Sequence, residues 1–414
     1  MKKISTLASL LLCAAMGATA QSVKVLHLDN ANEQTINAIS NNGQYFCGYT
    51  GRYYNGWFTY DIENGFYQSV NAADDQSMAA LAIANNGKAV GIVDYKATIF
   101  TSDTQTTPLD DNSATSSVAS AITADGNTIG GYVTNEEGYI TPCYWKRGVL
   151  KTLTVPAAEG FEADVYGAEV KAMSSDGNVI LGVLKDDQGV EPPIYWKKNT
   201  TGDYEVFSPY KGLPALEYGM PLENARLSDN GKYIAFADTY NESGAIIYLY
   251  DTEKAEMAKT FSIFDCTATV QGDMPITQAV TNNGLVYANI YGNSTLPVVA
   301  NPADGTMKTL FELYPNVSEL QAYADGTTCI ATVSGDGKKV IGTYTNENGD
   351  EEQGEIFLLN TDGNATAIAN DAANDVNVKE VARYNLSGMR IDAPAKGINL
   401  VKMSNGKVSK VVIR

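Results

Sequence analysis

The chain has 414 residues, and 48 acidic against 29 basic side chains give it a formal charge of −19. An acidic surface repels nucleic acid phosphates and anionic lipid, so both are excluded as partners. His27 is the only histidine, which excludes a multi-histidine zinc site, and a Ser-His-Asp or Cys-His centre would have to use it. We interpret His27 as a structural residue of an apolar strand.

Residues 1–20 have the pattern of a secretory signal peptide, because two lysines precede an apolar run that ends in small residues at Ala20. Cleavage there makes Gln21 the first residue of the exported chain, and loss of the lysines takes the formal charge from −19 to −21. A lipoprotein signal at Cys13 is the alternative, but Leu12 stands where such a signal needs a small residue. No later stretch approaches the roughly 20 apolar residues of a membrane helix.

One short phrase recurs along the rest of the chain: small and aliphatic residues, usually Ser or Thr, and then an Asn/Asp-Gly turn. Its turn glycines are 44, 39, 51, 54, 53 and 53 residues apart, a period typical of β-propeller blades. Asn-Gly and Asp-Gly supply the positive φ of a tight hairpin. The copies are 37–43, 81–87, 120–126, 171–177, 225–231, 278–284 and 331–337.

Each copy predicts a four-stranded unit, with the phrase at the end of the innermost strand. The second strand follows the turn and carries a small residue, which predicts close approach of the adjacent blade. Aromatic residues of the third strand, including Trp57, Trp145 and Trp196, are interpreted as packing between blades. The fold class is therefore an all-β propeller over 21–369, most simply with seven four-stranded blades; six or eight are the alternatives. Residues 23–28 are expected to pair with the last blade and close the ring.

Four cysteines remain after signal cleavage, and they are far apart in the sequence without any CxxC pair. This spacing argues against a metal cluster. Cys47, Cys143 and Cys329 fall in strand-like stretches, so we interpret them as free, buried thiols.

Two segments of the chain resemble known propeller repeats. The segment 227–236 with 247–251 resembles the WD-like propeller repeat of TolB-type proteins, and 36–43 is similar to the related HAF-type extracellular repeat. Both resemblances imply a secreted or periplasmic propeller that binds rather than catalyses.

Residues 370–380 are rich in Asn, Asp and Ala and predict a linker, after which the composition changes. The segments 384–390 and 396–400 and the basic, β-rich end resemble the C-terminal sorting domain of type IX secretion cargo in Bacteroidetes. The resemblance implies export through the periplasm to the outside or outer surface of a Gram-negative cell, with secretion machinery as a partner of residues 381–414. The alternative is a small β cap without a transport role. The residues that carry the motif are Tyr384, Asn385, Leu386, Gly388, Arg390, Lys396 and Gly397.

The loops between second and third strands vary most, and function concentrates on loops held by a rigid scaffold. Tyrosines interleaved with polar residues suit a sugar or a protein surface. We therefore expect an exported, non-catalytic binding propeller with a glycan or protein ligand; solvated loops without a ligand are the alternative. The candidate ligand-binding residues are Tyr53, Tyr54, Glu136, Tyr139, Tyr240 and Tyr291.

A carbohydrate-active enzyme with paired central carboxylates is the alternative function, since it needs no histidine. Two carboxyl groups within roughly 5–10 Å at the centre of the ring would indicate it. No cofactor or metal is predicted, because the acidic loop 350–352 is only a weak calcium signal without the spacing of a known calcium loop. Acidic residues placed to line the centre are Asp75, Glu169, Glu223 and Asp273.

Overall fold

The protein is described by a computed structural model. The structure describes residues 21–26, 28, 34–51, 54–73, 76–101, 105–156, 165–186, 191–210, 213, 222–238, 245–268, 272–292, 295–346, 354–362, 380–384, 391, 393, 395–403 and 408–413. His27 lies outside these residues. Contacts divide the chain into two compact bodies, Met1–Gly363 and Asn364–Arg414.

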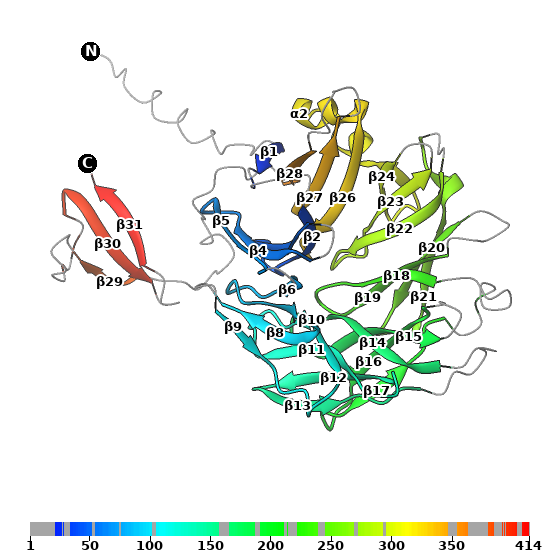
Figure 1. Ribbon diagram of the computed structural model, residues 1–414. Coiled ribbons are helices and arrows are strands. Elements are labelled where there is room, and N and C mark those ends of the chain that lie inside the picture. The colour runs from blue at the N-terminus through cyan, green and yellow to red at the C-terminus, as the bar shows by residue number, and fades with distance from the viewer. Residues whose placement is uncertain are drawn as a thin grey trace, which may run out of the picture. The chain divides into compact units, whose positions relative to one another are not determined.

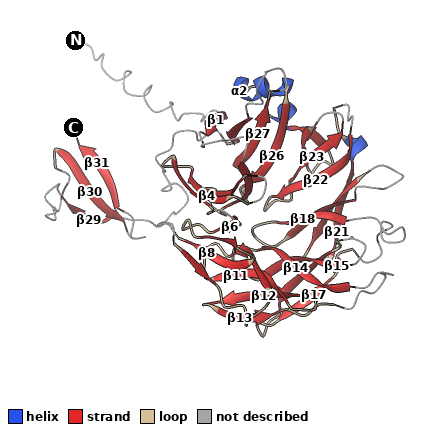
Figure 2. Cartoon of the chain, in the orientation of Figure 1, coloured by secondary structure: helices blue, strands red, loops and turns tan. Residues whose placement is uncertain are grey.

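The first body is built almost entirely of antiparallel strands (Figure 2). Its strands are β1 (Ser22–Leu26), β2 (Gln34–Ile39), β3 (Tyr45–Thr50), β4 (Gly56–Asp61), β5 (Phe66–Asn71), β6 (Met78–Ile83), β7 (Ala89–Val93), β8 (Lys96–Phe100), β9 (Thr106–Pro108), β10 (Ser116–Ile122), β11 (Thr128–Thr134), β12 (Ile140–Lys146), β13 (Val149–Thr152), β14 (Val165–Met173), β15 (Val179–Asp186), β16 (Pro193–Lys198), β17 (Tyr204–Phe207), β18 (Leu222–Leu227), β19 (Tyr233–Asp238), β20 (Ile246–Asp251), β21 (Glu256–Ser262), β22 (Gly272–Val280), β23 (Val286–Gly292), β24 (Leu296–Ala300), β25 (Met307–Thr309), β26 (Thr327–Val333), β27 (Lys339–Thr345) and β28 (Gly354–Asn360).

These strands pair in groups of four. Four-stranded sheets are formed by β2–β5, β6–β9, β18–β21 and β22–β25. Strands β10–β13 and β14–β17 are joined into one larger sheet by a parallel pairing of Ile140 with Gly167. The all-β fold with repeated four-stranded sheets is confirmed, whereas the number of blades stays a prediction.

The sheets follow one another around a common centre (Figure 1), with the strand that carries the repeated phrase innermost. Contacts between these inner strands pass from β2 to β6, β10, β14, β18, β22 and β26, and β26 contacts β2 again. The N-terminal strand β1 completes the last sheet, since Val25 pairs with Phe357 of β28. The predicted pairing of the N-terminal strand with the last repeat is therefore confirmed, and it leaves no unpaired outer edge on β28.

The recurring Ser or Thr holds the turn in six of the seven repeats, and the second repeat has Ala84 instead. In the fourth repeat the Ser174 hydroxyl donates to Asp176 at 2.7 Å and accepts from the Val179 amide at 3.0 Å. The same pair of bonds is made by Ser40, Thr123, Ser228, Thr281 and Ser334. All seven turn glycines have positive φ, from 66° at Gly43 to 87° at Gly284. The repeated phrase thus encodes a side-chain-locked hairpin.

In the five repeats where the small residue of the second strand is glycine, the close approach comes from the same sheet and not from the adjacent blade, so the prediction is wrong there. A Cβ on Gly131 would lie 1.9 Å from the carbonyl oxygen of Val118 and 2.9 Å from the Trp145 ring, both in the same sheet. The inner strand carries a β-bulge opposite this position, where the pairing shifts between Ala119 and Ala121. The bulge pushes a carbonyl toward the second strand, and at Gly131 only a residue without a side chain fits beneath the aromatic ring.

The aromatic residues of the third strands pack between neighbouring sheets, as predicted. Trp57 of β4 lies against Phe100 of β8, with ring centroids 4.7 Å apart, and both are 1% exposed. Trp145 is buried among apolar residues of the β6–β9 sheet. Cys47 and Cys143 are buried free thiols in the same layers, and burial raises the pKa of each. Cys266 and Cys329 are free and half-buried.

Short helices interrupt the strands in two connections, which the repeat pattern does not predict. A 3-10 turn, η3 (Ile263–Asp265), follows β21, and α1 (Leu310–Leu313), α2 (Ser318–Gln321) and η4 (Ala322–Asp325) lie between β25 and β26. Their buried residues Leu310, Leu320 and Tyr323 pack against the last sheet. Over the described ranges, no helix has the length and apolar character needed to cross a bilayer.

The second body is a small antiparallel sheet of β29 (Glu380–Tyr384), β30 (Gly397–Met403) and β31 (Val408–Ile413), in that order. Asn399 is buried, and its side-chain amide accepts from the Ala395 amide at 3.0 Å and donates to the Ala395 carbonyl at 2.6 Å. Of the predicted sorting residues, Tyr384 ends β29, Lys396 is exposed and Gly397 begins β30. Asn385, Leu386, Gly388 and Arg390 lie outside the described residues, as do Ala20 of the cleavage site and most of the predicted linker.

Candidate functional site

The inner strands enclose a central cavity of about 410 Å³. Its wall is contributed by β2, β6, β10, β14, β18, β22 and β26 together with the turns that follow several of them. A cavity of this size is in the range of small-ligand sites.

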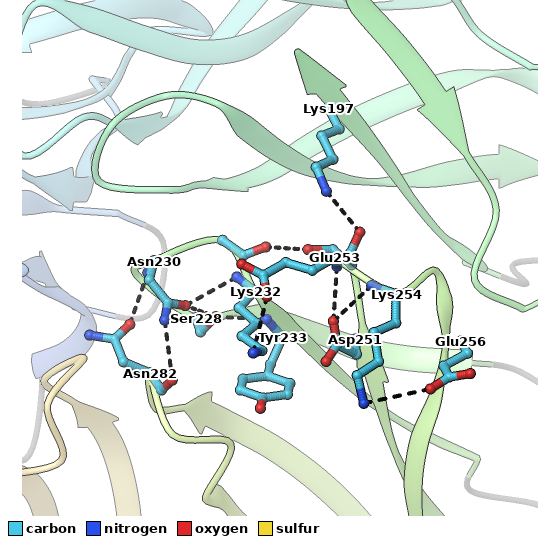
Figure 3. Close-up of polar contacts among 12 residues, drawn as sticks. Lys197, Ser228, Asn230, Lys232, Tyr233, Asp251, Glu253, Lys254, Glu256 and Asn282 are labelled. Atoms are coloured by element: carbon cyan, nitrogen blue, oxygen red, sulfur yellow. Dashed lines mark hydrogen bonds and ion pairs between the residues drawn. The ribbon is translucent and has the colours of Figure 1, made fainter. Parts of the chain in front are cut away.

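At one end of the cavity the repeated turns are bonded to one another in a circle. Figure 3 shows one link, in which the Asn230 amide donates to the Asn282 side chain at 2.8 Å. The circle ends where the Lys339 ammonium reaches the Gly43 carbonyl at 2.8 Å. The other links join Asn42 to Asn85, Asn85 to Ala124, Ala124 to Ser175, Ser175 to Asp229 and Asn282 to Gly335.

Asp229 reaches across this circle. Its carboxylate accepts from the Asn41 side chain and the Gly335 amide, which belong to the first and the last repeats, whereas Asp229 belongs to the fifth. A Cβ on Gly335 would lie 2.0 Å from Asp229 Oδ2, so the glycine makes room for the carboxylate. Burial outweighs these two hydrogen bonds and raises the pKa of Asp229 to about 6. Because these bonds link non-neighbouring repeats, they bar the turn end and leave the opposite face as the entrance.

The opposite face, which we call the loop face, holds the connections from second to third strands and from each sheet to the next. It carries most of the large apolar side chains that the described residues expose. Only Val149, between β12 and β13, is exposed at the turn end. Those on the loop face, each at least 39% exposed, are Tyr54, Tyr95, Tyr139, Tyr166, Phe264 and Met274.

Polar residues gather where the loop face meets the cavity. Tyr132 of β11 and Glu169 of β14 both line the cavity. Burial raises the pKa of Tyr132, and the charges of Glu169 and Glu191 and the Tyr54 hydroxyl act in the same direction, which places these groups near its hydroxyl. Tyr132 and Glu169 therefore form part of the cavity wall, and Glu191 and Tyr54 lie near enough to act on the Tyr132 hydroxyl.

Two lysines neutralise the carboxylates at the mouth. Lys171 lies 2.6 Å from Glu169, and Lys185 contacts Glu191 and lies 4.0 Å from Glu169. Burial disfavours the ammonium of Lys185, but the bond to Glu191 and the charge of Glu169 outweigh it, so the pKa of Lys185 is raised. The mouth therefore holds its charges as ion pairs.

Arg226 of β18 stands deeper in the cavity. It occupies the fifth position before the turn glycine, where Ala38, Ala82, Ala121, Ala172, Ala279 and Thr332 stand in the other repeats. All of these residues line the cavity. Neither Arg226 nor Asp229 is among the residues predicted from sequence. The available signal was a charged residue replacing a small one at a fixed position of the repeat.

The sequence-predicted loop residues are distributed unevenly. Tyr54 and Tyr139 are exposed on the loop face, and Glu136 is exposed in the loop between β11 and β12. Tyr291 is half-buried and hydrogen-bonded with Asn289 and Cys329, and burial raises its pKa to about 12. Of these described candidates, Tyr54 acts on the pKa of Tyr132, a residue of the cavity wall. Tyr53 and Tyr240 lie outside the described residues.

The carboxylates of the described cavity wall are far apart along it. The Ser175 amide donates to the Asp229 carbonyl, so the two residues lie at the same height along the cavity. Glu169 lies six residues before Ser175 in the same segment of chain. Six strand residues span roughly 20 Å, well beyond the separation that glycosidases use. Of the other acidic candidates, Asp75 lies outside the described residues, and nothing is described of the Glu223 and Asp273 side chains. Within the described ranges, no group of three His, Cys, Asp or Glu side chains is placed to hold a metal ion.

No protein-family model matches the sequence, and no curated protein matches it. Among solved structures, the WD40 repeats of RRP9 align with 82% of this chain and 97% of theirs, at 11% identity and a TM-score of 0.50. A puromycin hydrolase aligns over 89% of this chain and 58% of its own, at 11% identity and a TM-score of 0.54. At such identities the likeness concerns the fold alone, and it is the β-propeller fold.

Proposed function

We propose that this protein is an exported, non-catalytic binding propeller whose loop face takes a glycan or protein ligand. The observation that carries the proposal is the gathering of exposed tyrosines, with Phe264 and Met274, on the face where the cavity opens. Exposed apolar groups that gather on one face, unlike ones scattered singly, mark interaction sites. Tyrosine offers a flat apolar ring and a hydroxyl at low entropic cost, which suits a sugar ring or a protein surface.

Export is the second part of the proposal and rests on sequence. The lysine-apolar-small pattern of residues 1–20 supports a signal peptide, and the tail resembles a type IX sorting domain. The tail belongs to the second body, Asn364–Arg414, and not to the one that forms the cavity, so ligand binding and tail-dependent sorting are separable. The absence of catalysis is supported by the ion pairing of Glu169 and by its distance from Asp229.

The test is an array of host and dietary polysaccharides and extracellular proteins, exposed to the purified chain and assayed for both retention and released product. We expect retention without release. Tyr54→Ala combined with Tyr139→Ala should weaken retention about tenfold or more, because each truncation removes an aromatic contact. Val149→Ala is the matched control, since it truncates an exposed side chain at the turn end.

Two results would overturn this function. Release of sugars or peptides from the array would make the protein an enzyme. Retention that falls with Val149→Ala but not with the tyrosine variants would move the ligand to the turn end.

A further inference from the structure

Arg226, a half-buried cation, lines the central cavity. Arg226 Nε donates to the Gln278 carbonyl at 3.1 Å, and Nη1 donates to the Ala225 carbonyl at 3.2 Å. Among the residues that the structure describes, no carboxylate lies within ion-pair distance of its guanidinium. Burial lowers the pKa of Arg226 to about 10, so the group stays charged at neutral pH.

Such a charge is costly unless something pairs with it. A guanidinium has five N–H donors, and the two protein bonds leave donors for a ligand. The surrounding alanines leave room, since the same position carries a methyl group in most of the other repeats.

The other charged groups of the cavity do not serve as this partner. Glu169 is paired with Lys171. In its own repeat the position that corresponds to Arg226 is Ala172, and Glu169 lies three residues before it, roughly 10 Å along the strand. Asp229 follows Arg226 by three residues in the opposite direction and is bonded within the circle of turns. The middle of the cavity therefore carries a positive charge with which neither of these carboxylates pairs.

We propose that the central cavity is a binding site for a small oxyanion, a carboxylate, sulfate or phosphate group, which Arg226 holds through its remaining N–H donors. The planar fork of arginine matches such groups in a bidentate manner. The ligand enters from the loop face, because the turn end is barred by the Asp229 contacts. This site goes beyond the proposed surface binding and does not depend on it.

The test is calorimetric titration of the full chain with sodium sulfate, sodium phosphate and sodium glucuronate, against glucose and sodium chloride of matched ionic strength. We expect heat of binding with at least one oxyanion and none with glucose or chloride. Glucuronate alone would indicate an acidic saccharide, and sulfate or phosphate alone a tetrahedral anion.

Arg226→Ala is the informative variant, because five other repeats carry alanine at this position and the fold accommodates it. Loss of charge-assisted hydrogen bonds should weaken oxyanion binding about tenfold or more. Arg226→Lys should retain part of the affinity, and Arg226→Gln, which keeps a side chain of similar length, replaces the alanine variant if that one fails to fold. The proposal is overturned if no oxyanion binds the wild-type chain, or if a folded variant without the charge binds as tightly as wild type.

Discussion

At the scale of single residues, the informative positions are those where one repeat departs from the others. Arg226 replaces alanine, and Asp229 stands where the first, second and sixth repeats carry asparagine at positions 41, 85 and 282. Both departures line the central cavity, where the other repeats have small or neutral groups at the same two positions. Local inconsistency of this kind is expected where function or closure outweighs the packing rule.

Asp229 gives a pH-dependent prediction. Its pKa is raised from 3.8 to about 6 by burial, so the native state holds the proton more tightly than the unfolded chain does. The stability cost is absent below pH 4, grows between pH 4 and 6, and reaches about 3 kcal/mol above pH 6. Asp229→Asn keeps an acceptor and removes this cost. Urea unfolding across pH 4–8 should show the variant gaining stability over wild type as pH rises.

Asn85→Asp is the matched comparison for Asp229→Asn. It places a carboxylate at the same position of the second repeat, where the Asn85 amide donates to the Ala124 carbonyl. A stability difference between Asp229→Asn and wild type that stays constant from pH 4 to 8 would contradict the buried, proton-holding carboxylate.

At the scale of elements, most of the sheets share the same residue pattern in each strand, and the second repeat departs from it with Ala84 in place of Ser or Thr. The Ser or Thr lock forms the turn, the bulge shapes the inner strand, and the aromatic ring of the third strand covers the small residue of the second. The last sheet is the exception, because its outer strand β1 comes from the other end of the chain.

Strand β1 therefore carries a stability prediction. Leu26 is 2% exposed and packs with Ile356 and Leu358 of β28. Leu26→Ala should lower the free energy of unfolding by about 3 kcal/mol, the cost of a core cavity. Lys24→Ala, an exposed position on the same strand, should change it by less than about 0.5 kcal/mol. Equal effects of both variants in urea unfolding would show that β1 does not close the ring.

At the scale of the whole molecule, the chain has two bodies, one with the proposed binding face and one with the proposed sorting tail. The strand pairings of the first body are complete without any residue beyond 362. The second body is a separate three-stranded sheet whose buried Asn399 holds the turn before β30.

Removal of residues 381–414 should thus leave the first body folded and trap it in the periplasm, if the tail is a sorting domain. Cell fractionation and surface proteolysis measure the location, with the full-length chain in the same host as the control. Circular dichroism of the truncated protein checks that the sheets remain. Normal surface display of a folded truncated chain would contradict the sorting role.

The sequence alone determined the architecture, because its information is periodic and local. Asn/Asp-Gly turns, the preceding Ser or Thr and the third-strand aromatics each dictate short-range structure, and repetition at blade-sized spacing leaves a ring of sheets as the way to bury every face. The sequence also predicted that residues 23–28 pair with the last repeat, because they form a strand that is left over when each repeat is divided into four strands.

Only the tertiary structure decided which residues meet at the centre. Asn41, Asp229 and Gly335 are far apart in the chain, and the cross-ring contact depends on how the sheets converge. The same holds for Tyr54, Tyr132 and Glu169 at the mouth. The glycine environment was misjudged because a bulge, which shifts strand register by one residue, leaves no periodic signal in the sequence. Local chemistry specified the repeats, and the closing of the ring specified the site.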